Sequence, residues 1–216
     1  EGVPYEVGKA QYREIVTMQQ VLDAREIAWP LTLPMCSPIG DGAAAVVLAS
    51  QEGLRRLDRE PGRPDVQVLA SIDRSGTVPG HGPKSAPAAA HAAYEKSGIG
   101  PEDLDVAEIH DATALAELTL YEDLGFCSDG DAPKLLGTGR THLGGDMPVN
   151  PSGGLLSKGH PIGATGIAQL AELNEQLLDR AGDRQVSDAR IALAQNGGGW
   201  LDEDSAAMSV TILARN

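Results

Sequence analysis

The sequence is poor in cysteine, in aromatic residues and in basic residues. Of its 216 residues, two are cysteine and one is phenylalanine. Two cysteines do not provide a disulfide framework, so the composition fits a reducing compartment and we expect a cytoplasmic protein. The sequence shows no long apolar run and no charged-then-apolar leader. We therefore expect neither a membrane span nor a signal peptide.

Basic residues are outnumbered by acidic ones. The chain has 31 Asp and Glu against 17 Lys and Arg, a formal net charge of −14. Such a surface repels nucleic acid, and no basic stripe offsets it, so we expect no nucleic-acid partner. The histidines His81, His91 and His142 lack the spacing of a zinc site, and cysteines are scarce. We expect no bound metal.

Apolar patterns and helix-ending glycines predict alternating strands and helices. Strands are expected over residues 44–48, 66–72, 106–109, 191–194 and 207–213, and helices over 21–25, 86–97, 114–124 and after His160. Gly98 and Gly125 follow two of these helices, as C-terminal glycines commonly do. A polar, proline-bearing link is expected from Glu52 to Pro64. This alternation is typical of layered α/β domains.

The stretch from Asn150 to Gly166 carries the clearest chemical signal. Five glycines let its backbone adopt positive φ angles and approach a ligand closely. It places His160 just before a helix, where unpaired N–H groups favour negative charge, and Pro161 restricts the histidine's backbone. The apolar residues of that helix fall at helical spacing: Ile167, Leu170, Ala171, Leu177 and Leu178. The arrangement suits an oxyanion or a thiolate, although a lone histidine is often structural.

Two further motifs accompany this loop. Glu108-Ile-His-Asp-Ala-Thr113 ends an expected strand, and Gln195-Asn-Gly-Gly-Gly199 lies near the end of the chain. Shorter pieces agree in order: Lys9-Ala-Gln-Tyr-Arg13, Val21-Leu-Asp-Ala-Arg25, Pro30-Leu-Thr-Leu33, Cys36-Ser-Pro-Ile-Gly-Asp-Gly-Ala-Ala-Ala45, Gly80-His-Gly-Pro83 and Tyr121-Glu-Asp-Leu-Gly-Phe126. Together they resemble the C-terminal half of the thiolase superfamily, in particular its sterol-carrier-protein-type branch. The resemblance covers nearly the whole chain.

This resemblance implies the layered αβαβα thiolase fold. Residues 1–62 would be the end of the N-terminal half with a linker, and residues 63–216 the C-terminal domain. The family's nucleophilic cysteine lies upstream of anything present here, and neither Cys36 nor Cys127 looks like its replacement. We expect the sequence to be a fragment or another polypeptide to supply the first half. Thiolase-fold proteins are dimers or larger, so a homo-oligomer is expected.

The resemblance also assigns roles to two histidines. His160 matches the family histidine that activates the thiol and helps to hold an oxygen anion, which suits a group that titrates near neutral pH. His110 matches a histidine of the sterol-carrier-protein branch that orients a water or a thioester oxygen in the oxyanion hole. The alternative for His110 is a helix-capping role through Asp111. We interpret Asp111 as a helix cap rather than a base.

The sequence departs from the family where a second cysteine acts as acid and base. Ala112 and Asn196 occupy the two usual positions, and neither side chain exchanges protons near neutral pH. A water held by Asn196, a histidine or the substrate's own carboxylate remain as alternatives. A related branch that handles bulky aroyl or succinyl-type acyl-CoA is similar in this respect. Gly198 matches the glycine whose N–H helps to form a second oxyanion hole.

The substrate expected from the resemblance is a coenzyme A ester. Residues 75–85 resemble the loop along which thiolases lay pantetheine, so Ser75 and Gly82 are candidate contacts; the alternative is an ordinary exposed loop. We expect no tightly bound cofactor, with coenzyme A or acyl-CoA entering as substrate. Basic groups for its phosphates are sparse in this chain, and the missing half or a partner would provide them.

Three functions remain open from the sequence. The first is a thiolase-type acyl-CoA acyltransferase that cleaves 3-oxoacyl-CoA or runs in reverse. The second is a retro-aldolase of the steroid side-chain type, although such lyases tend to lose the glycine-histidine-proline loop that this chain keeps. The third is a noncatalytic subunit that binds coenzyme A esters. Many proteins of this branch work with a small zinc-ribbon/OB-fold partner, which the resemblance makes a further expectation.

Overall fold

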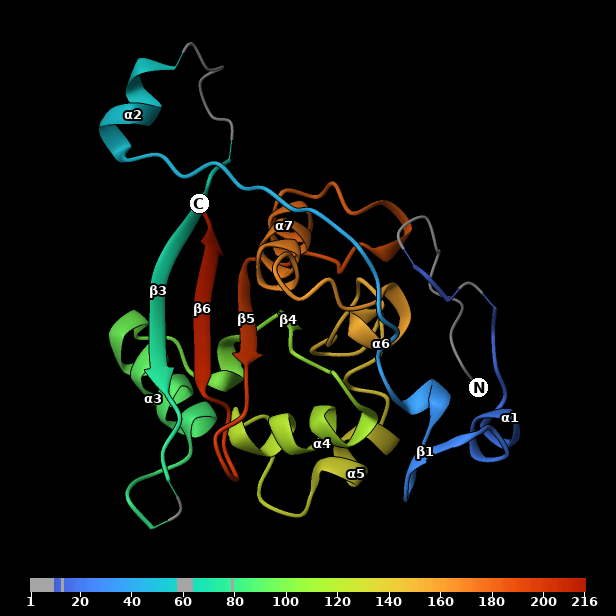
Figure 1. The fold of residues 1–216 in the computed structure, drawn as a ribbon. Coiled ribbons are helices and arrows are strands. Elements are labelled where there is room, and N and C mark those ends of the chain that lie inside the picture. Colours follow the sequence, from blue (N-terminus) through green and yellow to red (C-terminus); the bar gives the residue numbers. More distant parts are fainter. Residues whose placement is uncertain (1–9, 13, 58–63, 79) are drawn as a thin grey trace.

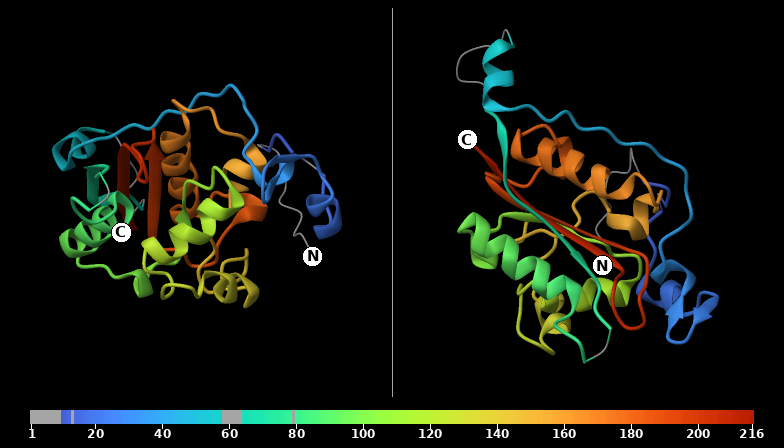
Figure 2. Two further views of the ribbon diagram at one scale, coloured as in Figure 1. Left: turned by 60° about the horizontal axis from the view of Figure 1, so that its bottom comes forward. Right: turned by 60° about the vertical axis from the view of Figure 1, so that its left-hand side comes forward.

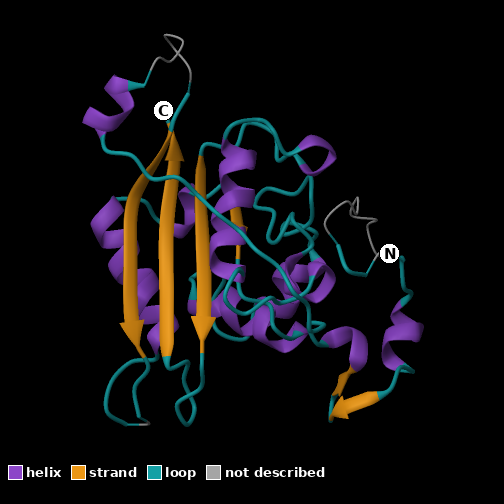
Figure 3. Ribbon diagram, turned by 45° about the horizontal axis from the view of Figure 1, so that its top comes forward, coloured by secondary structure: helices purple, strands orange, loops and turns teal. Residues whose placement is uncertain are grey.

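The computed structural model describes residues 10–12, 14–57, 64–78 and 80–216. Its centre is a four-stranded mixed sheet with the order β3-β6-β5-β4 (Figure 1). The strands are β3 (Val66–Ser75), β4 (Val106–Glu108), β5 (Ile191–Gly198) and β6 (Ala207–Arg215). β4 pairs parallel with β5, and β6 pairs antiparallel with both β5 and β3. The carboxyl ends of β3, β4 and β5 therefore meet at one edge of the sheet (Figure 3).

Helices cover both faces of this sheet. Helices α3 (Ser85–Ser97) and α4 (Ala114–Asp123) pack on one face, and α7 (Thr165–Leu177) packs on the other (Figure 2). Neighbouring strand residues alternate between the two cores, as a period of two requires: Ala107 and Leu193 join the α3 side, whereas Val106 and Ala192 join the α7 side. The expected layered α/β fold is confirmed.

Local sequence signals account for several helix ends. Helix α3 ends at Gly98, whose φ of 72° is the left-handed conformation that glycine adopts without strain. The Thr113 hydroxyl accepts a hydrogen bond from the Ala116 N–H and caps the start of α4. These helices and the four sheet strands lie where the sequence predicts them, with β3, β5 and β6 extending beyond the expected ranges and β4 ending one residue earlier.

The N-terminal segment consists of short helices and a hairpin, and a long stretch without helix or strand, residues 37–50, runs over the sheet domain (Figure 1). It contains α1 (Met18–Leu22), the hairpin of β1 (Glu26–Ala28) and β2 (Leu31–Thr32), and α2 (Gln51–Arg56) (Figure 1). Between Cys36 and Ser50 it passes close to the loops that follow β4 and α6 (Gly154–Lys158). The Ser37 N–H donates to the Ala112 carbonyl, and the His160 N–H donates to the Pro38 carbonyl at 3.1 Å.

Three expectations in this segment need correction. The helix expected over residues 21–25 lies at Met18–Leu22, because a capping box of Thr17 and Gln20 starts it earlier. The strand expected over 44–48 is absent from the described chain: Val47 is 95% exposed, and no neighbouring strand offers hydrogen bonds. The link expected from Glu52 to Pro64 begins as helix α2, and its residues 58–63 lie outside the described residues, as do Lys9 and Arg13 of the first motif.

Besides α2, two further short helices among the described residues were not predicted. Helix α5 (Ala132–Gly137) packs Ala132 and Leu135 into the core, and α6 interrupts the expected glycine-rich loop. The buried face of α7 also differs from the expected apolar set, of which only Leu177 is fully buried. The residues that are buried on α7 are Thr165, Gln169, Glu172, Leu173, Gln176 and Leu177. Because buried polar side chains are nearly always hydrogen-bonded, this face of α7 is expected to make side-chain hydrogen bonds to the sheet.

Candidate active site

The imidazole rings of His110 and His160 are in contact. Their centroids lie 4.8 Å apart and the planes meet at 90°, an edge-to-face arrangement. His110 lies two residues after the end of β4, at the carboxyl-end edge of the sheet, and His160 lies between α6 and α7. This edge is where open α/β sheets place their ligands. Two residues that are 50 positions apart in the sequence thus share one site.

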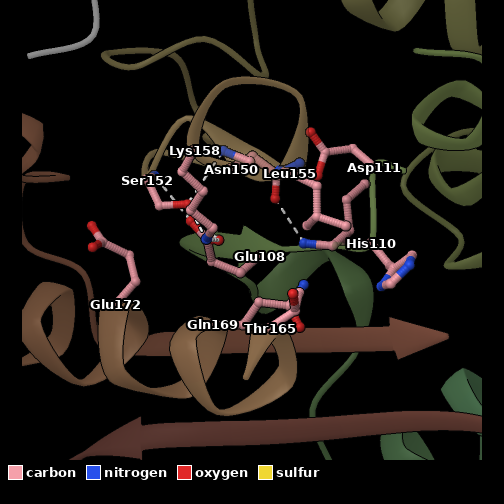
Figure 4. Close-up of polar contacts among 12 residues, drawn as sticks. Glu108, His110, Asp111, Asn150, Ser152, Leu155, Lys158, Thr165, Gln169 and Glu172 are labelled. Carbon is pink, nitrogen blue, oxygen red and sulfur yellow. Dashed lines mark hydrogen bonds and ion pairs between the residues drawn. The ribbon is translucent and has the colours of Figure 1, made fainter. Parts of the chain in front are cut away.

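Asp111 holds the two histidine-bearing segments together. Its buried carboxylate accepts hydrogen bonds from the N–H groups of Leu155 (2.7 Å) and Leu156 (3.3 Å), in the first turn of α6 (Figure 4). A Cβ on Gly154 would overlap that carboxylate, so the glycine is needed for the close approach. Asp111 does cap a helix, but the helix is α6 and not α4, which follows it in the sequence.

A chain of amide groups supports the His110 ring. Asn196 Nδ2 lies 3.1 Å from His110 Nδ1 and also donates to Gln169 Oε1 at 3.1 Å. Gln169 Nε2 donates in turn to the Gln195 carbonyl at 3.0 Å. The Gln195 side chain accepts from the His110 N–H at 2.8 Å. β5 therefore fixes both the backbone and the ring of His110.

The His160 ring has a different partner. Its Nδ1 lies 2.8 Å from the hydroxyl of Thr165, the first residue of α7. That hydroxyl donates to the Pro161 carbonyl at 3.1 Å, so it offers a lone pair to Nδ1. In this arrangement Nδ1 of neutral His160 carries the proton. Its Nε2 is then the atom that can accept one.

Both imidazoles are neutral at physiological pH. Burial, together with the neighbouring His160, lowers the pKa of His110 from its ordinary value of 6.5 to about 4. Burial also lowers the pKa of His160. Asp111 shows the opposite shift: burial and the nearby Glu117 raise its pKa well above the ordinary value, while the Leu155 and Leu156 N–H groups oppose the rise. Perturbed pKa values gathered in one place are typical of functional sites.

Ser75 and Gly198 lie at the same sheet edge as the histidines. Both pair with Ala207 of β6, one from β3 and one from β5, and both are exposed. Gly82 lies in the exposed loop before α3, where a Cβ would contact the side chain of Thr77. This loop is held by Asp204, whose carboxylate accepts from the Thr77 N–H and from the N–H and hydroxyl of Ser85.

An open groove lies beside His160. It has a volume of about 450 Å³ and is lined by Gly40, Asp41, Gly42, Ala43, Ala44, Pro161, Ile162, Gly163 and Ala164. Most of these side chains are small, and Asp41 is the only charged one. Pro161, the residue that follows the histidine, forms part of its wall.

A buried ion pair lies behind the site. The Glu108 side chain is fully buried and binds Lys158 Nζ at 3.2 Å, and the Ser152 hydroxyl bridges both (Figure 4). Removing one partner of such a pair leaves an uncompensated buried charge, so the pair ties β4 to α6. Sequence reasoning missed this pair and missed Gln169. For Gln169 the sequence did contain a signal: the polar residues 165, 169, 172 and 176 fall on one face of the predicted helix.

The described side chains form no cluster that could bind a metal ion. Among the residues that the structure describes, no group of three or more His, Cys, Asp or Glu side chains is placed to hold a metal ion. Cys36 and Cys127 are both free thiols. Within the same described ranges, no helix is long and apolar enough to cross a membrane.

The fold and the paired histidines define an α/β domain with a site at the carboxyl ends of its parallel strands. The family model described as thiolase C-terminal domain-like matches residues 77–214, and the chain belongs to this family. The match lies inside the expected C-terminal domain of residues 63–216, whose boundary stays a prediction.

Several curated proteins are similar over most of the chain. Acetyl-CoA acetyltransferase of Methanothermobacter thermautotrophicus is 42% identical over 197 residues, which are 88% of this chain and 50% of that protein. Benzoylsuccinyl-CoA thiolase subunit BbsB of Thauera aromatica is 40% identical over 197 residues, again 88% and 50%. Human sterol carrier protein 2 is 39% identical over 198 residues, 88% of this chain and 36% of that protein. The chain spans half or less of the length of these relatives.

A solved structure has the same fold. The protein described as Ltp2-ChsH2(DUF35) aldolase superposes with a TM-score of 0.76, covering 94% of this chain and 52% of that one. Its sequence identity is 23%, so the likeness concerns the fold alone. Family and fold agree with the expected C-terminal half of a thiolase.

Proposed function

We propose that this chain supplies the histidine-bearing half of a thiolase-type acyl-CoA acyltransferase that acts on 3-oxoacyl-CoA. The observation that carries the proposal is the His110–His160 contact at the carboxyl-end edge of the sheet. In the forward direction, 3-oxoacyl-CoA and free coenzyme A give a shortened acyl-CoA and acetyl-CoA. The reverse direction is a Claisen condensation.

The two histidines take complementary roles in this reaction. A cysteine thiolate from a half outside this sequence would attack the 3-oxo carbon, and His160 Nε2 would accept the thiol proton. His110 would donate a hydrogen bond to the substrate oxygen that becomes negative, with the Gly198 N–H serving the second oxygen anion. A donor of this kind contributes about 3 kcal/mol to catalysis. Neutral imidazoles suit both tasks, because one gives a hydrogen bond and the other takes up a proton.

Surface and length support a further half. Ile39, Val47 and Ile162 are 95%, 95% and 83% exposed, and they lie in or beside the segment that flanks the histidines. Large apolar side chains that are this exposed lose contact with water when a partner surface covers them, which favours an interface here. The relatives with acetyltransferase and thiolase names are about twice as long as the matched region. The proposal assigns this surface to the cysteine-bearing half.

The proposed substrate is a coenzyme A ester with a bulky acyl group. The groove of small residues beside His160 supports room for such a group, and the relative named for benzoylsuccinyl-CoA supports an aroyl class. Ser75 and Gly82 are proposed to contact the pantetheine arm. We also propose a homo-oligomer, a zinc-ribbon/OB-fold partner and a cytoplasmic location, the last supported by the two free cysteines.

The test uses the native polypeptide that contains this chain. It is incubated with 3-oxoacyl-CoA substrates, with and without free coenzyme A, and the products and the intact mass of the protein are measured. We expect coenzyme-A-dependent cleavage and a protein that gains the acyl mass on a cysteine. Cleavage of a 3-hydroxyacyl-CoA to a free carbonyl compound without coenzyme A would instead establish the retro-aldolase. Binding of the ester with neither reaction would leave a noncatalytic subunit.

A further inference from the structure

We infer that Gln169 is a positioning residue that acts through Asn196 to hold His110 in the neutral tautomer with its proton on Nε2. For its catalytic meaning the inference rests on the proposed function, in which His110 donates a hydrogen bond to an oxygen anion. Its structural content does not depend on that function. It follows from the direction of each hydrogen bond in one partly buried chain of side chains.

The chain of bonds starts at a group with a fixed direction. The Gln195 carbonyl oxygen can only accept, so the end of the Gln169 side chain that lies 3.0 Å from it is the NH₂ group. Gln169 Oε1 then faces Asn196, and an oxygen can only accept as well. Asn196 must therefore present its NH₂ group, at 3.1 Å. The amide orientations are thus set by the backbone of β5.

The last bond sets the tautomer. The same NH₂ group of Asn196 lies 3.1 Å from His110 Nδ1. One of its two hydrogens is donated to Gln169 Oε1, so the other points to that ring nitrogen. Nδ1 must accept, so it carries no proton and the neutral ring is protonated on Nε2. Doubly protonated His110 would place an N–H against the amide protons. The relay therefore opposes both the other tautomer and the imidazolium.

Burial makes this relay rigid. The side chains of Gln169 and Gln195 are 0% and 1% exposed, so water does not compete for their polar atoms. Gln195 also accepts from the His110 N–H at 2.8 Å, which fixes the backbone while Asn196 fixes the ring. As a result, Nε2 of His110 presents an N–H to the site. Nε2 of His160 presents a lone pair, because the Thr165 hydroxyl holds the His160 proton on Nδ1.

The tautomer is measured directly by solid-state ¹⁵N NMR on the native protein labelled with ¹⁵N-histidine, at about pH 7 and without substrate. Subtracting the spectrum of His110→Asn isolates the two His110 nitrogens. We expect an unprotonated Nδ1 and a protonated Nε2, in at least roughly tenfold excess, because the other form loses a buried hydrogen bond. A protonated Nδ1 in the wild-type protein overturns the inference.

Three variants test the relay itself. Asn196→Asp offers only acceptors, so Nδ1 of His110 should become protonated. Gln169→Met removes the acceptor that orients Asn196, so the Nδ1-protonated form should rise several-fold. Gln169→Glu keeps an acceptor for Asn196 and, with its other oxygen protonated, a donor for the Gln195 carbonyl, so it should keep the wild-type tautomer. If Gln169→Met does not fold, the other two variants still decide. The His110 tautomer must reverse in Asn196→Asp and stay as in the wild type in Gln169→Glu, and any other pair of results refutes the relay.

A matched control separates the relay from general damage to α7. Gln176 is also fully buried on α7 and also donates to a backbone carbonyl, that of Arg184 at 2.8 Å. Gln176→Met should leave the His110 tautomer unchanged, and an equal change there would refute a specific role for Gln169. Acyl transfer is measured separately: kcat of Asn196→Asp should fall about 100-fold with KM little changed. A protein with the expected tautomer but no acyl transfer would sink the proposed function and leave the relay standing.

Discussion

Replacing His110 by Asn should make the stability of the protein less sensitive to acid. The folded state holds the pKa of His110 at about 4, below its ordinary value of 6.5, chiefly through burial. The unfolded chain therefore binds a proton more readily than the folded chain. For such a histidine, stability is fully present above the unfolded pKa and is lost as the pH falls from about 6.5 towards 4.

The two pKa values give the size of the effect. Between pH 7.5 and 4.5, the linkage relation gives a loss of about 2.5 kcal/mol in the free energy of unfolding from this group. An asparagine does not titrate, so His110→Asn should lack this part of the loss. Carboxyl groups with raised pKa values, such as Asp111, act in the opposite direction in both proteins, and their contribution cancels in the comparison.

The assay is urea unfolding of the native protein and the variant at both pH values. The wild-type protein should lose about 2.5 kcal/mol more than His110→Asn between pH 7.5 and 4.5. His91→Asn is the matched control, because the His91 side chain is 74% exposed and makes one surface contact with Glu95. An acid sensitivity in His110→Asn equal to that of the wild type would refute the assignment of a buried, neutral His110.

The remaining predictions concern a base, a glycine and a carboxylate. His160→Asn should lower acyl transfer and the exchange of substrate α-protons with D₂O alike, each by about 100-fold or more, as measured by product formation and mass spectrometry. Gly154→Ala should destabilise the protein by roughly 2–4 kcal/mol in urea unfolding because a Cβ meets Asp111, whereas Gly137→Ala, with open space around it, should be nearly neutral. Asp204→Ala should lower the melting temperature and raise KM for acyl-CoA by releasing the loop before α3; unchanged values in both would contradict its anchoring role.

The pH response of Asp204 has the same sign as that of His110 and the opposite sign from that of Asp111. Burial alone would raise the pKa of Asp204, but hydrogen bonds from Ser85, Thr77 and Ser205 hold it below its ordinary value. A carboxyl group with a lowered pKa stabilises the fold above its unfolded pKa, and that contribution disappears as the pH falls through the folded value. At physiological pH the anchor is therefore fully ionised and holds the loop.

Local patterns in the sequence predicted the elements that local forces determine. The alanine-rich helix ends at Gly98 because glycine alone adopts its φ of 72° freely, and the buried strands follow from their apolar runs. The short helix α6 could not be predicted in this way, because its first N–H groups are satisfied by Asp111, more than 40 residues upstream. The failed strand over residues 44–48 has the reverse cause: its composition suits a strand, but no partner strand lies beside it.

The sequence predicted that His110 and His160 share a site, but it did not predict the side chains that support them. Motifs placed His110 and His160 in one family pattern, and the structure brings their rings together. Their protonation states depend on two residues of α7: Thr165 contacts His160 directly, and Gln169 acts on His110 through Asn196. Both contacts form only after α7 has packed on the sheet. No spacing in the sequence encodes the direction of those hydrogen bonds. A polar stripe on a helix that faces a core is the nearest available signal.

These contacts also narrow the search for the second acid and base. The Ala112 side chain has no exchangeable proton. Both amide hydrogens of Asn196 are directed at His110 and Gln169, which leaves only the Asn196 side-chain oxygen to hold a water. His110 has a pKa of about 4, with Nδ1 occupied by the amide. Of the groups in contact here, His160 is the one whose Nδ1 is bound by a hydroxyl that offers a lone pair, which leaves its Nε2 to accept a proton. One histidine would then serve the thiol in the first step and the α-carbon in the second, which is why its loss should affect acyl transfer and α-proton exchange together.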